Sequence, residues 1–302
     1  MSKWRASSGK GTCVAFSVPP ERPVPGTVVA ILRHAAEATR ASGIAYCVGG
    51  ELARDLLLFH VFGQRTGRAT RDVDVMVFVE DWGAFEALKT RLLATGEFTA
   101  ADAAHRLLYG SMEVPLDLVP FGGVEGPAGA VAWPPERAVV MSVVGFREAA
   151  HTAIPIVVDE ALTVPVVALA ALSLLKLTAW LDRHQETDKD AIDLLTLLRL
   201  YHAAGNEDRL YGEETELLAA CGFDPEWAGA RLLGRDAVRL CGGETVRAVL
   251  RRLPTALRRG IEDQMLRQAV QFGDETLQAR IERLLAAFLD ELAGAATGLN
   301  SN

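Results

Sequence analysis

Asp72, Asp74 and Asp117 are the residues of this 302-residue chain whose types and spacing point most directly to chemistry. Asp72 and Asp74 stand two apart at the start of the alternating, apolar run 72–79, which is typical of a strand. Because residues two apart in a strand project from the same face, we expect their carboxylates side by side. Asp117 lies in a second strand-like run, 114–120, and would join them if the two strands pair.

Three neighbouring carboxylates repel one another, and burying them without counter-ions costs several kcal/mol. Divalent cations relieve this repulsion, and Mg²⁺ prefers carboxylate and phosphate oxygens, with Mn²⁺ as a substitute. We therefore expect Asp72, Asp74 and Asp117 to hold two Mg²⁺ ions. Two ions about 3.5–4 Å apart activate an attacking hydroxyl and stabilise leaving pyrophosphate, which is the chemistry of nucleotidyl transfer. The structural alternative is an exposed strand edge or a loop cap.

The pair Gly49-Gly50 follows a short strand-like run, 44–48, and precedes a helix-like run, 51–62. Glycines without a Cβ let backbone amides approach a triphosphate, and the N-terminus of the following helix favours an anion. We expect these glycines to bind the phosphates of a nucleoside triphosphate (NTP), the substrate of such a reaction. An ordinary turn is the alternative.

Lys176 and Arg183 stand seven apart in a helical pattern, about two turns, and so share one helix face. Arg183 could bind the same triphosphate as a fork and Lys176 as a point charge. Asp190 and Asp193, three apart on the next predicted helix, would orient those cations by ion pairing or contact the acceptor. A purely structural salt-bridge network among the four stays open.

The pattern along the chain predicts the elements that position these residues. We expect a helix at 27–42 closed by Gly43, a crossover helix at 85–94, and strands at 44–48, 72–79, 106–109, 112–119 and 154–158. From about Pro165 the pattern is helical, with breaks near Gly205, Gly222, Gly242 and Gly273. This indicates an extended arm at 1–26, an α/β domain at 27–160 with a mixed sheet flanked by helices, an all-helical domain at 161–296 and a disordered tail at 297–302.

The order of these motifs resembles the nucleotidyltransferase superfamily of DNA polymerase β. The likeness rests on Val48-Gly49-Gly50, Arg71-Asp72-Val73-Asp74 and Leu116-Asp117-Leu118. Leu175-Lys176-Leu177, Asp182-Arg183, Lys189-Asp190 and Asp193-Leu194 further resemble the AbiEii-like group, nucleotidyltransferases often found as toxins of toxin–antitoxin pairs. The likeness extends over about residues 44–198. The group often has serine after the first glycine, where this chain has Gly50, so backbone amides would have to bind the phosphate.

The resemblance implies an enzyme that moves a nucleoside monophosphate (NMP) from an NTP to an acceptor hydroxyl in a Mg²⁺-dependent reaction. Asp72 and Asp74 would hold both metals, and Asp117 would hold the catalytic metal and deprotonate the acceptor. The resemblance also implies RNA, including tRNA, as the acceptor and a cognate antitoxin protein as a partner.

Three other hypotheses stay open. The net charge of −8 suits nucleotidylation of a cationic small molecule such as an aminoglycoside antibiotic. The run 48–57 also resembles tRNA CCA-adding and poly(A) enzymes, although no later arginine-rich templating motif matches. The non-enzyme hypothesis is an inactive binding module with a nucleotidyltransferase fold, and the presence of all three aspartates weighs against it.

Composition excludes several classes of protein. With 50% hydrophobic and 23% charged residues, the chain is typical of globular proteins. The first 11 residues lack the apolar segment of a secretory signal, and the apolar run 161–175 is shorter than the ~20 residues that span a bilayer, so we expect a cytoplasmic protein with no membrane partner. The four cysteines are far apart and indicate neither a zinc site nor a disulfide framework.

Arg231, Arg235 and Arg239 recur every four residues along one predicted helix. Such a stripe could follow an RNA backbone, although a solvated face is the commoner reason for it.

Overall fold

The structure is a computed structural model that describes residues 15–67, 72–127, 129–135, 137, 139–270 and 277–298. Arg71, Gly273 and most of the predicted tail lie outside the described residues. The helix α11 (Leu277–Gly298) includes the first two residues of that tail.

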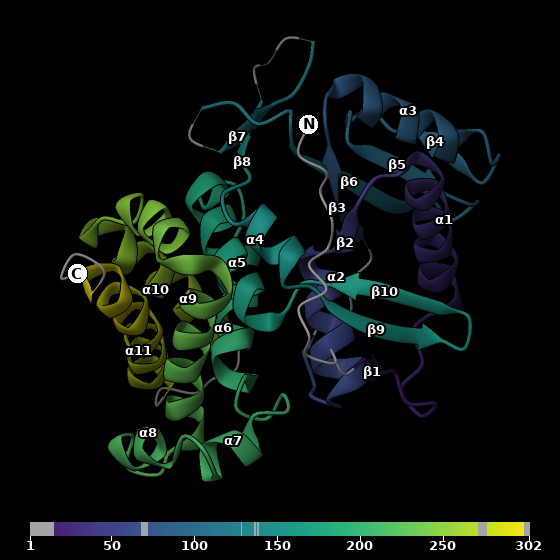
Figure 1. The fold of residues 1–302 in the computed structure, drawn as a ribbon. Coiled ribbons are helices and arrows are strands. Elements are labelled where there is room, and N and C mark those ends of the chain that lie inside the picture. The colour runs from purple at the N-terminus through teal and green to yellow at the C-terminus, as the bar shows by residue number, and fades with distance from the viewer. Residues whose placement is uncertain are drawn as a thin grey trace.

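An eight-stranded mixed sheet forms the first part of the molecule, with the order β1-β9-β10-β2-β3-β6-β5-β4 (Figure 1). Its strands are β1 (Phe16–Ser17), β2 (Tyr46–Val48), β3 (Val73–Val79), β4 (Phe98–Ala100), β5 (Arg106–Tyr109), β6 (Val114–Gly122), β9 (Ile154–Asp159) and β10 (Leu162–Val166). The pairs β3–β6, β1–β9 and β10–β2 are parallel and the others antiparallel. The remaining strands, β7 (Ala130–Ala132) and β8 (Val140–Ser142), form a separate two-stranded ribbon that projects from the head.

Helices flank the sheet because each buries one apolar face against it. The helices α1 (Gly26–Ser42) and α3 (Trp82–Leu93) pack on each other and on β3. Gly43 ends α1 in the left-handed conformation, at φ 66°, as predicted. On the other side, α2 (Gly50–Asp55) continues into a π-helical turn, η1 (Leu56–Val61), and contacts both β3 and the helical region.

The second part of the molecule is a group of helices that begins with α5 (Figure 1). Its members are α5 (Leu169–Arg183), α6 (Lys189–Leu200), α7 (Glu207–Tyr211), α8 (Thr215–Ala220), α9 (Pro225–Arg251), α10 (Thr255–Val270) and α11, with the short α4 (Phe146–His151) packed on α5 and α9. The predicted breaks at Gly205 and Gly222 separate helices, and Gly242 interrupts α9 with a non-helical φ of 78°. No helix within the described ranges is both long enough and apolar enough to cross a membrane.

The predicted fold class, a mixed α/β head followed by helices, is confirmed. The strands β1, β4, β7, β8 and β10 and the helix α4 were not predicted; β1 lies within the predicted arm, and the others are too short to show a clear period. The strand β10 belongs to the sheet although it lies just beyond residue 160, where we expect the α/β domain to end. The domain boundary stays a prediction. Pro165 argues against a strand in the sequence, because proline is uncommon inside strands. The strand β10 tolerates it because β10 pairs with β2 only at Val166 and Val48.

Candidate functional site

The register of the two central strands brings the predicted aspartates together. β3 and β6 are parallel neighbours in which Asp74 lies directly opposite Asp117. Asp72 stands immediately before β3 and two residues from Asp74, so the two carboxylates belong to the same face. Asp117 is buried, Asp74 is half-buried, and the side chain of Asp72 is 40% exposed. The pairing that the sequence left open is therefore present.

Crowding of negative charge is evident at Asp74. Burial raises the pKa of the Asp74 carboxyl to about 6, and the charge of Asp117 is the next cause. Asp72 adds to the rise, while Lys176 and Arg183 act against it. A cation beside Asp74 would relieve this repulsion.

Arg106, which was not predicted as a site residue, binds the innermost carboxylate. It lies on β5 opposite Asp117 on β6. Its Nε and Nη2 atoms donate to the two carboxylate oxygens of Asp117, both at 2.7 Å. Nη2 also stands 3.8 Å from Oδ2 of Asp72. Asp74, Asp117 and Arg106 thus form one row across three adjacent strands.

The donor chemistry of the three carboxylates fits a hard divalent cation, because all their ligand atoms are oxygens and because burial and the charge of Asp117 both disfavour the ionised form of Asp74. Within the part of the chain that the structure describes, no three His, Cys, Asp or Glu side chains form a group already arranged to hold a metal. The guanidinium of Arg106 engages Asp117 instead.

Gly50 is required by its contact with Asp74. The residue has a φ of 58°, and a Cβ built on it would lie only 1.9 Å from Oδ2 of Asp74. Its neighbour Gly49 is the N-cap of α2 and donates its N–H to the carbonyl oxygen of Asp74 at 2.9 Å. The glycine pair therefore joins the start of α2 to the aspartate strand, and serine at position 50 would clash with Asp74.

The two predicted cations face the aspartates from the helical region. Lys176 and Arg183 on α5 line the same cavity as Gly50, Asp74 and Asp190, a space of about 150 Å³. Apolar side chains, including Met141, Phe146 and Leu172, line the remainder of this cavity.

The predicted ion pairing between α5 and α6 is present. Lys176 Nζ lies 2.5 Å from Oδ2 of Asp193 and 3.4 Å from Oδ1 of Asp190. Arg183 forks onto Asp190 through Nε at 2.7 Å and Nη2 at 2.9 Å. Burial, the largest single cause, acts to raise the pKa of Asp190. The hydrogen bonds and charges of Arg183 and Lys176 together outweigh it and lower that pKa. The network holds the two cations at the cavity, so the structural and the functional hypotheses are compatible.

Most of the chain matches the model of a known protein family. The model of the family described as "Nucleotidyl transferase AbiEii toxin, Type IV TA system" matches residues 56–295. The chain belongs to the AbiEii family. The match includes Asp72, Asp74, Asp117 and the four charged residues of α5 and α6, and it starts after Gly49 and Gly50.

Solved nucleotidyltransferases are distant from this AbiEii-family chain. An antigenic nucleotidyltransferase-like protein from Paracoccidioides brasiliensis shares 14% identity at a TM-score of 0.38, over 66% of this chain and 93% of that one. The Thermotoga maritima CCA-adding enzyme, solved with tRNA, shares 12% identity at a TM-score of 0.25, over 92% and 82%. TM-scores this low carry no conclusion about substrate or mechanism. No curated protein sequence matches the chain.

Arg54 is a second residue of the AbiEii-family chain that sequence reasoning missed. It is 1% exposed, and its guanidinium bonds with Glu51, Asp55 and, from the helical region, Asp193. Its signal in the sequence is a charged Arg54-Asp55 pair within an otherwise apolar helical run.

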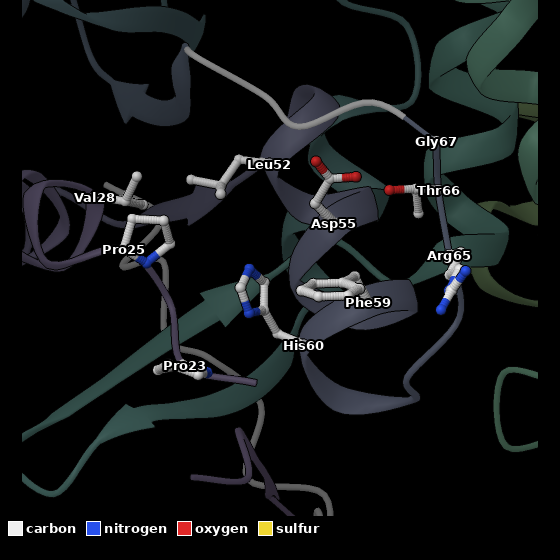
Figure 2. A pocket seen from close by; sticks show the side chains of 10 residues that line it. All are labelled: Pro23, Pro25, Val28, Leu52, Asp55, Phe59, His60, Arg65, Thr66 and Gly67. Carbon is white, nitrogen blue, oxygen red and sulfur yellow. The ribbon is translucent and has the colours of Figure 1, made fainter. Parts of the chain in front are cut away.

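A larger cavity of about 520 Å³ lies apart from Asp72, Asp74 and Asp117 (Figure 2). It lies between the start of α1 and the α2–η1 segment, with Leu52, Asp55 and Phe59 on one wall. None of its described lining residues also lines the cavity at Asp74.

The arginine stripe of α9 is neutralised by acidic neighbours. Arg231 pairs with Glu291, Arg235 pairs with Glu214 and Glu291, and Arg239 pairs with Asp236. These pairs offset much of the positive charge of the stripe, which favours a solvated face over a basic track for an RNA backbone.

Proposed function

We propose that the chain transfers an NMP from an NTP to an acceptor hydroxyl in a Mg²⁺-dependent reaction. The observation that carries the proposal is the β3–β6 register, which sets Asp117 beside Asp74, a residue that lines one cavity with Lys176 and Arg183. Acidic and cationic walls on one cavity match a substrate that carries both a polyphosphate and its metal ions.

The acidic side of the site would bind the metal and receive the proton. Asp72, Asp74 and Asp117 would hold the divalent ions, which when bound neutralise the triphosphate and acidify the attacking hydroxyl. Asp117, the most buried of the three, would accept the proton of that hydroxyl. Burial keeps the Asp117 carboxylate away from bulk water, and its charge acts more strongly there than it would in water.

The cationic side would orient the triphosphate. Arg183 has a half-exposed side chain whose charge reaches Asp74, so it can turn toward a phosphate while Asp190 holds its other edge. Lys176 is buried and fixed by Asp190 and Asp193, which makes it a positioned point charge. The amide of Gly50 adds an uncharged donor at the same cavity.

We propose RNA, including tRNA, as the acceptor and a cognate antitoxin as the partner. The support for the antitoxin is the family description, which names a toxin of a toxin–antitoxin system, and the RNA acceptor follows from the resemblance noted in the sequence. The neutralised stripe of α9 and the net charge of −8 favour a second candidate acceptor, a cationic small molecule.

The test is incubation of the purified chain with each of the four labelled NTPs, Mg²⁺ and total RNA, with an aminoglycoside as a separate acceptor. We expect transfer of label to RNA by the native chain, and a loss of at least about 100-fold in Asp74→Asn. Asp159→Asn, which alters an acid at the end of β9, is the matched control and should keep its activity. Label on the aminoglycoside alone would select the second candidate. Absence of transfer to both acceptors with every NTP would end the proposal.

A further inference from the structure

Arg106 occupies the space that the acidic cluster offers to a cation. Its planar guanidinium engages both oxygens of Asp117 and stands 3.8 Å from Asp72. The positive charge therefore lies between two of the three carboxylates that the proposed function assigns to the metal. A fork-shaped pair of this kind is among the stronger ion pairs in proteins.

The partners of this ion pair differ in their freedom to move. The Asp117 side chain is 11% exposed and is held in the strand between β3 and β5. The Arg106 side chain is 34% exposed and lies on the solvent side of the pair. Asp117 therefore cannot leave the site, whereas Arg106 can turn outward on its long, flexible stem.

A divalent ion and Arg106 need the same oxygens of Asp117. A carboxylate whose two oxygens both accept from one guanidinium has limited capacity to bind a metal in the same plane. His105, with Nε2 4.0 Å from Oδ1 of Asp117, is a second basic group beside this carboxylate among the described residues, and burial lowers its pKa. Arg106 is thus the permanently charged neighbour with which an ion must compete.

We propose that Arg106 is an internal counter-ion that competes with divalent cations for Asp117. Without metal, it stabilises the buried carboxylate; when the ion binds, the guanidinium leaves Asp117 and turns to solvent. The strength of the Arg106–Asp117 pair then sets the affinity for metal. This inference rests on the proposed function only in taking Asp117 as a metal ligand.

The test measures Mn²⁺ binding without NTP, by the electron paramagnetic resonance signal of free Mn²⁺. We expect Arg106→Gln to lower the Kd for Mn²⁺ by at least about tenfold relative to the native chain, since a neutral amide competes poorly for a carboxylate. Asp117→Asn combined with Arg106→Gln should lose this gain. Arg33→Gln removes an equal charge from a pair with Asp159 and serves as the control.

An equal or weaker affinity in Arg106→Gln, or an equal gain in Arg33→Gln, would overturn the proposal. Arg106→Gln leaves the buried carboxylate of Asp117 with one partner fewer, which could disturb the fold. A second measurement therefore uses the native chain. The Nε–H resonance of Arg106, assigned with Arg106→Lys, should shift and exchange faster with water as Mg²⁺ saturates the site. A resonance that stays unchanged while Mg²⁺ binds would equally contradict displacement.

These outcomes separate the inference from the proposed function. Tighter Mn²⁺ binding in Arg106→Gln without any nucleotidyl transfer would sink the function and leave the competition in place. Transfer activity in the native chain, together with a Mn²⁺ affinity that does not change on substitution of Arg106, would support the function and overturn the competition.

Discussion

At the scale of single residues, the site depends on close contacts that tolerate few substitutions. The Oδ2 atom of Asp74 lies where a Cβ on residue 50 would be, so the chain has glycine there although serine is common in the group. The chain therefore has no side-chain hydroxyl at this position, and the Asp74 carboxylate occupies the space instead. Residue type and backbone conformation are therefore linked at this position.

Asp74 should make the stability of the metal-free protein depend on pH. Its pKa rises from 3.8 to about 6 on folding, so between these values the folded protein holds a proton that the unfolded chain has released. Stability therefore falls as pH rises from about 4 to about 6, and the penalty persists above that range. In EDTA at pH 7.5, Asp74→Asn should raise the free energy of unfolding by roughly 2–3 kcal/mol.

Urea denaturation of both proteins between pH 4 and pH 8 checks this expectation. The difference should be near zero at the acid end and constant above pH 6.5. If the difference in free energy of unfolding between the two proteins does not change with pH, the raised pKa of Asp74 is not the cause of that difference.

At the scale of elements, α9 and α11 pack closely because α9 has a glycine at their contact. A Cβ on Gly234 would lie 2.8 Å from the carbonyl oxygen of Phe288 and 2.8 Å from Cβ of Glu291. The facing side chain of Phe288 is fully buried, so the two helices cannot separate without exposing apolar surface.

Gly234→Ala should therefore destabilise the chain by about 1–3 kcal/mol, the usual cost of inserting a methyl group into a packed contact. Gly294→Ala is the matched control, because a Cβ there meets nothing within 4 Å and alanine favours a helix by about 1 kcal/mol. Thermal unfolding of the two variants should move the Tm in opposite directions. Equal shifts would mean that the glycine contact does not hold α9 and α11 together.

At the scale of the whole molecule, the buried guanidinium of Arg54 joins the head to the helical region. It comes from α2, the helix that begins at Gly50, and binds Asp193 on α6, which also binds Lys176 on α5. Five charged side chains thereby form one ionic network between the head and the helical region, namely Arg54, Lys176, Arg183, Asp190 and Asp193.

Arg54→Met should cost about 3–5 kcal/mol, since Asp193 would stay buried with Lys176 but without Arg54. Amide hydrogen exchange should quicken in α2 and α6 together, because the contact between them is lost. Arg283→Met, which breaks an ion pair with Asp224 whose side chains are 41% and 32% exposed, should cost less than about 1 kcal/mol. Similar losses in the two variants would argue against a coupling role for Arg54.

Local patterns in the sequence were sufficient for much of this architecture. The alternation around Asp72 and Asp74, the strand 106–109, the end of α1 at Gly43 and the breaks at Gly205, Gly222 and Gly242 are encoded within a few residues each. Periodicity and glycine conformation act locally, so they can be read without knowing the partners.

The sequence by itself was enough to predict which side chains would carry the chemistry, namely the three aspartates, the glycine pair and the charged residues of α5 and α6. Only the tertiary structure decided that Asp117 lies opposite Asp74, that Arg106 binds Asp117, and that Arg54 reaches Asp193 across 139 residues of sequence. It also decided that Arg231, Arg235 and Arg239 of α9 pair with acidic side chains. The physical reason is that strand register and buried ion pairs depend on which distant segments pack together, and no local spacing specifies that packing.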